Sequence, residues 1–157
     1  MAVLGMVFSF IELSEATSYT LNYSHRGVCD DETASVLKHT RPWTVSDLPS
    51  AMTKELEGKV FNGIRVNLSF NLISDEGILP LLDYLQGLPL IYLDLSHNQI
   101  TNSGIRLLLS SPIMAAFFVD NACQLVITGN SGANPSNIRK IQESSLRLPI
   151  GEKVTWS

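Results

Sequence analysis

Hydrophobic residues recur at two different spacings between Leu88 and Leu109. Leu93 and Leu95 alternate with polar residues, which is typical of a strand with one buried face. Asn98 and Ile100 follow, and the run IRLLL then has the spacing of a helix with one buried side. This segment therefore predicts a strand, a turn and a helix, in that order.

The same pattern is repeated along the chain. VNLSFNLISDEG, residues 66–77, and LDLSHNQITNSG, residues 93–104, share their apolar, Ser, Asn, Ile and Gly positions at an offset of 27 residues. A third copy, LVITGNSG, begins at Leu125, at an offset of 32 residues from the second. Val154 and Trp156 fall a further 29 residues along the chain and predict another strand. Because a helix returns the chain after each strand, we predict parallel strands with helices outside them.

Asparagine occupies the same turn position in each copy. The residues are Asn71, Asn98 and Asn130. An asparagine amide can both donate to and accept from backbone groups, which need such partners where a turn lies inside the stack and water is excluded. We therefore predict a row of asparagines that joins adjacent turns. Gly104, near the start of the next helix, is predicted to allow a close approach or an unusual backbone torsion.

These repeats resemble the leucine-rich repeat family. The family pattern L-x-x-L-x-L-x-x-N-x-L is met in the central copy by Leu90, Leu93, Leu95, Asn98 and Ile100. The resemblance covers residues 63–148, with departures at Gly63, Ala122 and Gly132. The repeat length and the helix in each repeat are similar to the ribonuclease-inhibitor-like subclass. The resemblance implies a short α/β solenoid that binds other proteins through its strand face and is not an enzyme.

The rest of the chain is predicted to close the two ends of the stack, because a repeat stack needs capping structure. Alternating residues and the run YTLNYS predict a β-hairpin over about residues 3–24, and DETASVLKH and TVSDLPSAMTKELEG predict two short helices. The first run, MAVLGMVFSFI, is read as a buried strand, with a targeting segment as the alternative. We therefore expect one compact domain, with an N-terminal hairpin and helical cap over 1–60, leucine-rich repeats over 61–149 and a C-terminal edge strand or cap over 150–157.

Composition limits the classes of function. The chain has 157 residues, 45% of them hydrophobic, which is enough for one domain with a buried core. A net charge of −4 gives no basic surface for nucleic acid, and no apolar run reaches the roughly 20 residues that span a membrane. Cys29 and Cys123 are too few for a disulfide framework. We therefore predict a cytoplasmic protein.

Two clusters have the composition of catalytic sites without the required arrangement. Asp94, Ser96 and His97 contain the residue types of a hydrolase triad, but Ser96 and His97 are adjacent and are expected to point to opposite faces of a strand. TGNSGANPSN, residues 128–137, precedes a helix but lacks the lysine and the spacing of a phosphate-binding loop. We read it as a turn, with Asn134 as the helix cap.

A third cluster, His25, Cys29 and Asp30, has the residue types of a metal site, but no second cluster completes four ligands. We therefore predict no catalysis, no metal and no cofactor.

The outward positions of the three strands form the predicted binding surface. They are Arg65, Asn67, Ser69, Tyr92, Asp94, Ser96, Gln124, Val126 and Thr128. Tyr92 is expected at the centre, with Arg65 and Gln124 on the neighbouring strands, and aromatic and arginine side chains are common anchors in protein interfaces. The alternative for this surface is a plain solvated sheet face.

We predict a non-catalytic interaction module or adaptor that binds a partner protein through this surface. The alternative is a structural subunit that docks into a larger assembly through its terminal edge strands, because uncovered edge strands pair readily with other chains.

Overall fold

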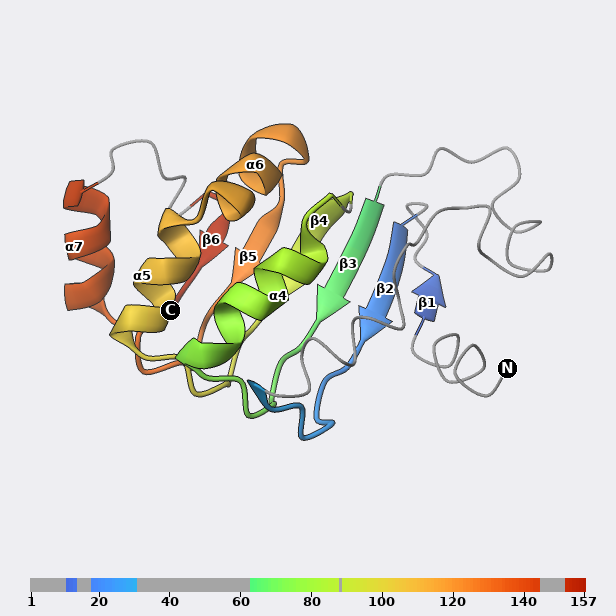
Figure 1. Ribbon diagram of the computed structural model, residues 1–157, viewed down its shortest axis with the longest axis horizontal. Helices are drawn as coiled ribbons and strands as arrows, with labels where there is room; N and C mark the ends of the chain where they lie inside the picture. Colours follow the sequence, from blue (N-terminus) through green and yellow to red (C-terminus); the bar gives the residue numbers. More distant parts are fainter. Residues whose placement is uncertain (1–10, 14–17, 31–62, 88, 145–151) are drawn as a thin grey trace.

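The computed structural model describes residues 11–13, 18–30, 63–87, 89–144 and 152–157 (Figure 1). The described strands are β1 (Ile11–Leu13), β2 (Ser18–Asn22), β3 (Gly63–Asn67), β4 (Leu90–Asp94), β5 (Gln124–Val126) and β6 (Val154–Thr155). The described helices are the short 3₁₀ helix η2 (Asp75–Gly77), α4 (Ile78–Leu85), α5 (Asn102–Ser110), α6 (Pro112–Asp120) and α7 (Pro135–Ser144). The two helices predicted between residues 30 and 58, and the first residues of the predicted hairpin, lie outside the described residues.

The six strands form one sheet in the order in which they occur in the chain. Strands β1 and β2 are antiparallel, and every later neighbouring pair is parallel. Helices α4 and α5 cross one face of this sheet, as Figure 1 shows. A chain that enters each strand from the same end must return outside the sheet, and here the return is made by these helices. The predicted fold class, a short α/β solenoid with parallel strands and outer helices, is confirmed.

The apolar positions of the repeats lie in register at the centre of the core. Val66 pairs with Leu93, and Leu93 pairs with Leu125 on the next strand. All three side chains are fully buried, and so are the second apolar positions of the three copies, Leu68, Leu95 and Ile127. Burying a side chain of this size contributes roughly 1.5–3 kcal/mol, so these aligned rows are a main source of stability.

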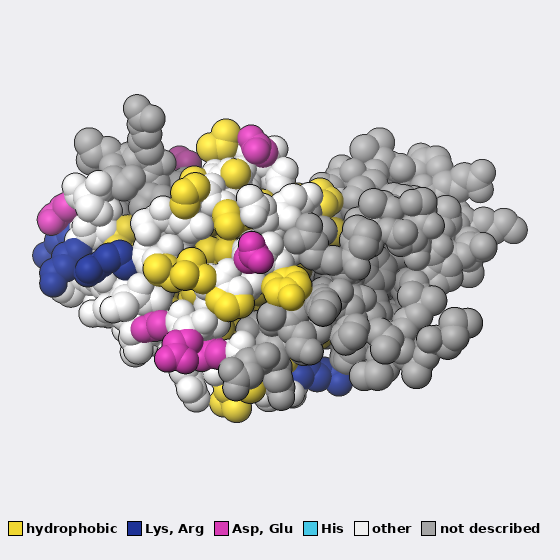
Figure 2. Space-filling model, viewed as in Figure 1, with side chains coloured by type: hydrophobic (Ala, Val, Ile, Leu, Met, Phe, Trp, Pro, Cys, Tyr) yellow, Lys and Arg dark blue, Asp and Glu magenta, His cyan; other side chains and the backbone are white. Residues whose placement is uncertain are grey.

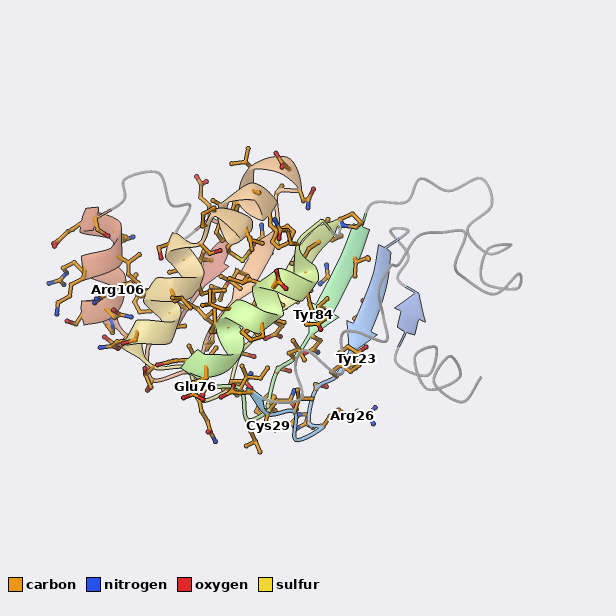
Figure 3. The ribbon with its side chains drawn as sticks, viewed as in Figure 1. Tyr23, Arg26, Cys29, Glu76, Tyr84 and Arg106 are labelled. Carbon is orange, nitrogen blue, oxygen red and sulfur yellow. The ribbon has the colours of Figure 1, made fainter. Side chains whose placement is uncertain are left out.

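The second strand of the N-terminal hairpin also continues the repeat stack. Strand β2 is parallel to β3, with Leu21 opposite Val66. Tyr23 and Val28 then enter the same core as the repeat residues. Figure 3 shows the turn after β2, with Arg26 and Cys29 at the same end of the sheet as the other turns. The hairpin is therefore joined to the solenoid as its first parallel strand.

Helix α6 is an addition that the repeat pattern does not predict. Ser111 caps it, since its hydroxyl accepts a hydrogen bond from the Ile113 N–H at 3.2 Å, and Pro112 is its first residue. At its other end, the Lys153 ammonium donates to the Phe118 carbonyl at 2.9 Å. A cation at this position is favourable because a helix carries partial negative charge at its C-terminus. Lys153 thus ties the β6 segment to α6.

Membrane-spanning length was also considered for the described helices. Within residues 63–87 and 89–144, no single helix is long and apolar enough to cross a membrane. Helices α5 and α6 satisfy the requirement only as a pair, by length and composition, and the pair is bent by 55°.

Cys123 is expected to resist alkylation in the folded protein. Its side chain is fully buried, and this burial raises the pKa of the thiol from 9.0 to about 12. At pH 8 we expect iodoacetamide to modify Cys29, which is half-buried, and to reach Cys123 only in denaturant. Peptide mass spectrometry measures both sites. Equal native rates for the two thiols would show that Cys123 is accessible.

The same raised pKa gives Cys123 a pH-dependent contribution to stability. Folding favours the protonated thiol, so this contribution is fully present below pH 9.0 and is lost as the pH rises toward about 12. Denaturation midpoints measured across this range should fall less for Cys123→Ala than for the parent chain.

Candidate functional site

The sheet face opposite α4 and α5 carries the predicted binding residues. We call this surface the strand face and define it by Arg65, Asn67, Tyr92, Asp94, Gln124, Val126 and Thr128. Gln124 is exposed and the others are half-buried, whereas the core residues between them on the same strands are fully buried. This alternation places the seven side chains on the side of the sheet that faces away from the core.

Arg65 and Tyr92 form the centre of the strand face. They are opposite each other on β3 and β4, and Gln124 follows on β5. The Arg65 Cζ atom lies 4.1 Å from the centroid of the Tyr92 ring, within the range of a cation–π interaction. An exposed interaction of this kind is worth roughly 0.5–1 kcal/mol and holds both side chains in place.

The Tyr92 hydroxyl stays protonated at neutral pH. Partial burial raises the pKa of Tyr92, and the Asp94 carboxylate raises it further through its charge and a hydrogen bond, while Arg65 acts in the opposite direction. The phenol is therefore a neutral hydrogen-bond donor to Asp94. Arg65, Tyr92 and Asp94 form one connected group across two strands.

Ser69 and Ser96 are not contact residues, which corrects the prediction for these two positions. They are only 6% and 7% exposed. The Ser69 hydroxyl donates to Asn67 Oδ1 at 2.7 Å, and the Ser96 N–H donates to Asp94 Oδ1 at 2.9 Å. These bonds turn the chain inward where each strand ends, so the strand alternation no longer applies at the serines.

The three repeat asparagines bond the backbone of neighbouring turns. Asn98 Nδ2 donates to the carbonyl oxygens of Leu68, Leu95 and Ser96 at 2.9, 3.0 and 3.2 Å, and its Oδ1 accepts from the Ile73 N–H at 3.0 Å. Asn71 likewise accepts from the Val28 N–H at 2.9 Å, and Asn130 accepts from the Ile100 N–H at 3.0 Å. We call this row the asparagine ladder. It fixes the spacing of the strands that carry the strand face.

A second row of side chains joins the starts of the helices, and the sequence analysis did not find it. Asp75 accepts hydrogen bonds from the N–H of Thr101, at 2.7 Å, and from its hydroxyl. Asp30 accepts the same two bonds from Ser74 one repeat earlier. The available signal was an aspartate two residues after the apolar position that follows each turn. Asp30, a member of the candidate metal cluster, is therefore part of this structural row.

Gly104 provides the space that this row requires. A Cβ atom at Gly104 would lie 2.1 Å from Asp75 Oδ1, and one at Gly77 would lie 2.4 Å from Asp30 Oδ1. The glycine is needed for a close approach, and an unusual torsion is not involved. The loop at residues 128–137 has a similar structural explanation, since Asn134 Oδ1 accepts from the Asn137 N–H at 2.9 Å at the start of α7.

Three rings stack on one another beside the turns. The ring centroids of His25 and Phe70 are 4.4 Å apart, and those of Phe70 and His97 are 4.3 Å apart. Each of these residues has a φ near +55°, a left-handed conformation that costs roughly 1–2 kcal/mol for a non-glycine residue. Stacking between neighbouring repeats offsets part of that cost. His97 is therefore a member of a ring stack, and its neighbour Ser96 is buried.

The helix side of the molecule has a different character (Figure 2). Lys and Arg side chains gather at the α7 end, where Arg106, Arg139 and Lys140 are all exposed. Leu79 and Val119 are exposed hydrophobic residues on α4 and α6, separate from each other in the chain. Isolated apolar residues of this kind are common on protein surfaces and do not define a site. The strand face is thus the better candidate.

Comparison with known families agrees with this architecture. A leucine-rich repeat family model matches residues 64–82 and 89–109, which contain most of β3 with η2 and the first half of α4, and β4 with most of α5. A search of curated proteins found no match. The ribonuclease-inhibitor-like subclass stays a prediction. The matched repeats and the parallel stack built from them show that the chain belongs to the leucine-rich repeat family.

Proposed function

We propose that the chain is a non-catalytic interaction module that binds a partner protein through the strand face. The observation that carries the proposal is the Arg65–Tyr92 pair at the centre of that face, with the ring and the guanidinium 4.1 Å apart. Aromatic and arginine side chains are the residue types most often found to dominate binding energy in protein interfaces. Leucine-rich repeats are in general protein-interaction modules, which supports the same function.

The rigidity of the strand face also supports this proposal. The asparagine ladder and the Asp30 and Asp75 bonds fix neighbouring strands from both ends of the turns. A surface that is already ordered loses less conformational entropy when a partner binds. Cys29 and Cys123 are both free thiols, which supports a proposed location in the reducing cytoplasm.

Tyr92→Ala is expected to weaken partner binding by about tenfold or more, because it removes the central anchor and the support of Arg65. The partner is captured from native cell extract on the immobilised chain, purified, and titrated by calorimetry against each variant. Tyr92→Phe retains the ring and should bind within a fewfold of the parent. Leu79→Ala, on the helix side and 60% exposed, is the matched control and should bind like the parent.

Stability and binding are separated by a melting curve for each variant. Tyr92 points away from the core, so Tyr92→Ala should melt close to the parent. Full affinity in a variant with both Arg65 and Tyr92 changed to alanine would place the partner on another surface and end the proposal.

The second candidate function is a structural subunit that docks through an edge strand. Strand β6 is at one end of the described strand order and pairs with β5 on one side. It is only two residues long, and short edge strands are poor templates for pairing with another chain. Sedimentation separates the two candidates, because the docking subunit should self-associate alone and the interaction module should not.

A further inference from the structure

The two charged side chains of the strand face differ in how they are paired. Asp94 accepts a hydrogen bond from the Ser96 N–H at 2.9 Å and another from the Tyr92 hydroxyl. Arg65 has no hydrogen-bond or ion-pair acceptor among the residues that the structure describes, and its contact is the Tyr92 ring. Lys153, which is level with Gln124 on the next strand, uses its ammonium at the end of α6. The charge left available on this face is therefore the Arg65 guanidinium.

The Tyr92 contact prepares this guanidinium for a planar acceptor. Five N–H donors lie in the guanidinium plane and match the two oxygens of a carboxylate, with which arginine forms paired hydrogen bonds. The ring restricts the Arg65 side chain before a ligand arrives, so less side-chain entropy is lost on binding. The ring also excludes water from one side of the pair, which strengthens a charged hydrogen bond.

We propose that Arg65 binds the carboxylate of an aspartate or glutamate side chain that the partner protein places against Tyr92. This proposal rests on the proposed function and specifies the chemistry of the partner. The negative charge of Asp94, two residues beyond Tyr92 on the same strand, disfavours a second carboxylate beside the first. The partner segment should therefore carry one acidic residue at this position and not an acidic run. A phosphorylated segment or a nucleic acid fits less well, because the strand face offers a single available cation.

The proposal is tested with peptides selected from a random display library on the full wild-type chain. Selected peptides are synthesised in two forms, with the acidic residue present or changed to its amide. Each form is titrated against the parent, Arg65→Gln, Arg65→Lys and Tyr92→Ala. Arg65→Gln and the amide peptide should each weaken binding by about tenfold or more. When both changes are combined, binding should fall no further than with either alone, because they remove the same pair.

Arg65→Lys retains the charge but not the planar pair of donors, so it should recover only part of the affinity. Binding that falls with Tyr92→Ala, but not with Arg65→Gln or with the amide peptide, overturns the carboxylate assignment and leaves the proposed function in place. Peptides that bind every strand-face variant equally overturn both proposals.

A direct measurement covers the case in which no peptide is selected. The Arg65 Nε–H signal is followed by NMR while sodium acetate is added, with sodium chloride at equal ionic strength as the control. A saturable shift with acetate alone, abolished by Tyr92→Ala, supports the carboxylate site. Identical responses to the two salts overturn it. Melting curves close to the parent for all variants confirm that the fold is unchanged.

Discussion

Replacing Asn98 by alanine is expected to lower the free energy of unfolding by about 3 kcal/mol or more. The side chain makes four hydrogen bonds to backbone groups, and it is 9% exposed. Its removal leaves the Ile73 N–H and several carbonyl oxygens without partners in a place that water does not reach. A buried backbone group left unpaired costs roughly 1–3 kcal/mol. Chemical denaturation measures the loss.

Gln99→Ala is the matched control for this change, because Gln99 is exposed and follows Asn98 directly. Its backbone N–H keeps the bond to the Ile73 carbonyl at 2.8 Å, so the control should unfold like the parent. An Asn98→Ala midpoint equal to that of the parent would mean that the turn is solvated, and the asparagine ladder would then have no structural role.

Replacing Gly104 by alanine is expected to lower the free energy of unfolding by about 2 kcal/mol. The added methyl group would lie 2.1 Å from Asp75 Oδ1 and 2.6 Å from Ile100 Cγ2, so the aspartate must move away from Thr101. Overpacking typically costs about 1–3 kcal/mol, and the lost hydrogen bonds add to it. The loss is measured by denaturation together with Ser103→Ala, an exposed change one residue earlier.

A double-mutant cycle with Asp75→Ala identifies the cause of the Gly104 effect. Once Asp75 has been shortened, Gly104→Ala should cost clearly less, because the closest contact has gone and only the one with Ile100 remains. Strictly additive losses would show that Asp75 and Gly104 do not interact, and the second row of side chains would lose its proposed role.

The core of the fold could be predicted because each repeat meets the same physical requirement. Leu93 and Leu95 point into the core from a strand, and Asn98 serves a turn that water does not reach. Neither requirement depends on contacts far away in the chain, so the residue pattern records both directly. The same spacing correctly predicted β6 from Val154, although this strand has only two residues.

Two parts of the fold could not be predicted from the repeat pattern. In the turn after β2 the asparagine position holds Arg26, and the next strand partner of Leu21 is Val66, so both the motif and the spacing are missing. That turn is served instead by Asn71 of the following repeat, which is a long-range contact. Helix α6 was missed because one helix per repeat was assumed, although Ser111 and Pro112 form a recognisable start.

The candidate site was predicted where the strands are regular and missed where they end. Arg65 and Tyr92 lie within paired strands, so their alternation with core residues gives the correct side of the sheet. Ser69 and Ser96 follow turns made by Asn67 and Asp94, and alternation cannot be extended past such a turn. The contact between Arg65 and Tyr92 itself depends on the register of two strands, which the repeat offset supplied.

The segments that return the chain from one strand to the next can change in length without moving the strands. Paired positions are 45 residues apart from Leu21 to Val66, 27 from Val66 to Leu93 and 32 from Leu93 to Leu125, yet all of them are in register. Alignment is therefore imposed at the turns and not by the connectors. Insertions and deletions in the connectors should be tolerated, so related chains can vary in length there while presenting an unaltered recognition surface.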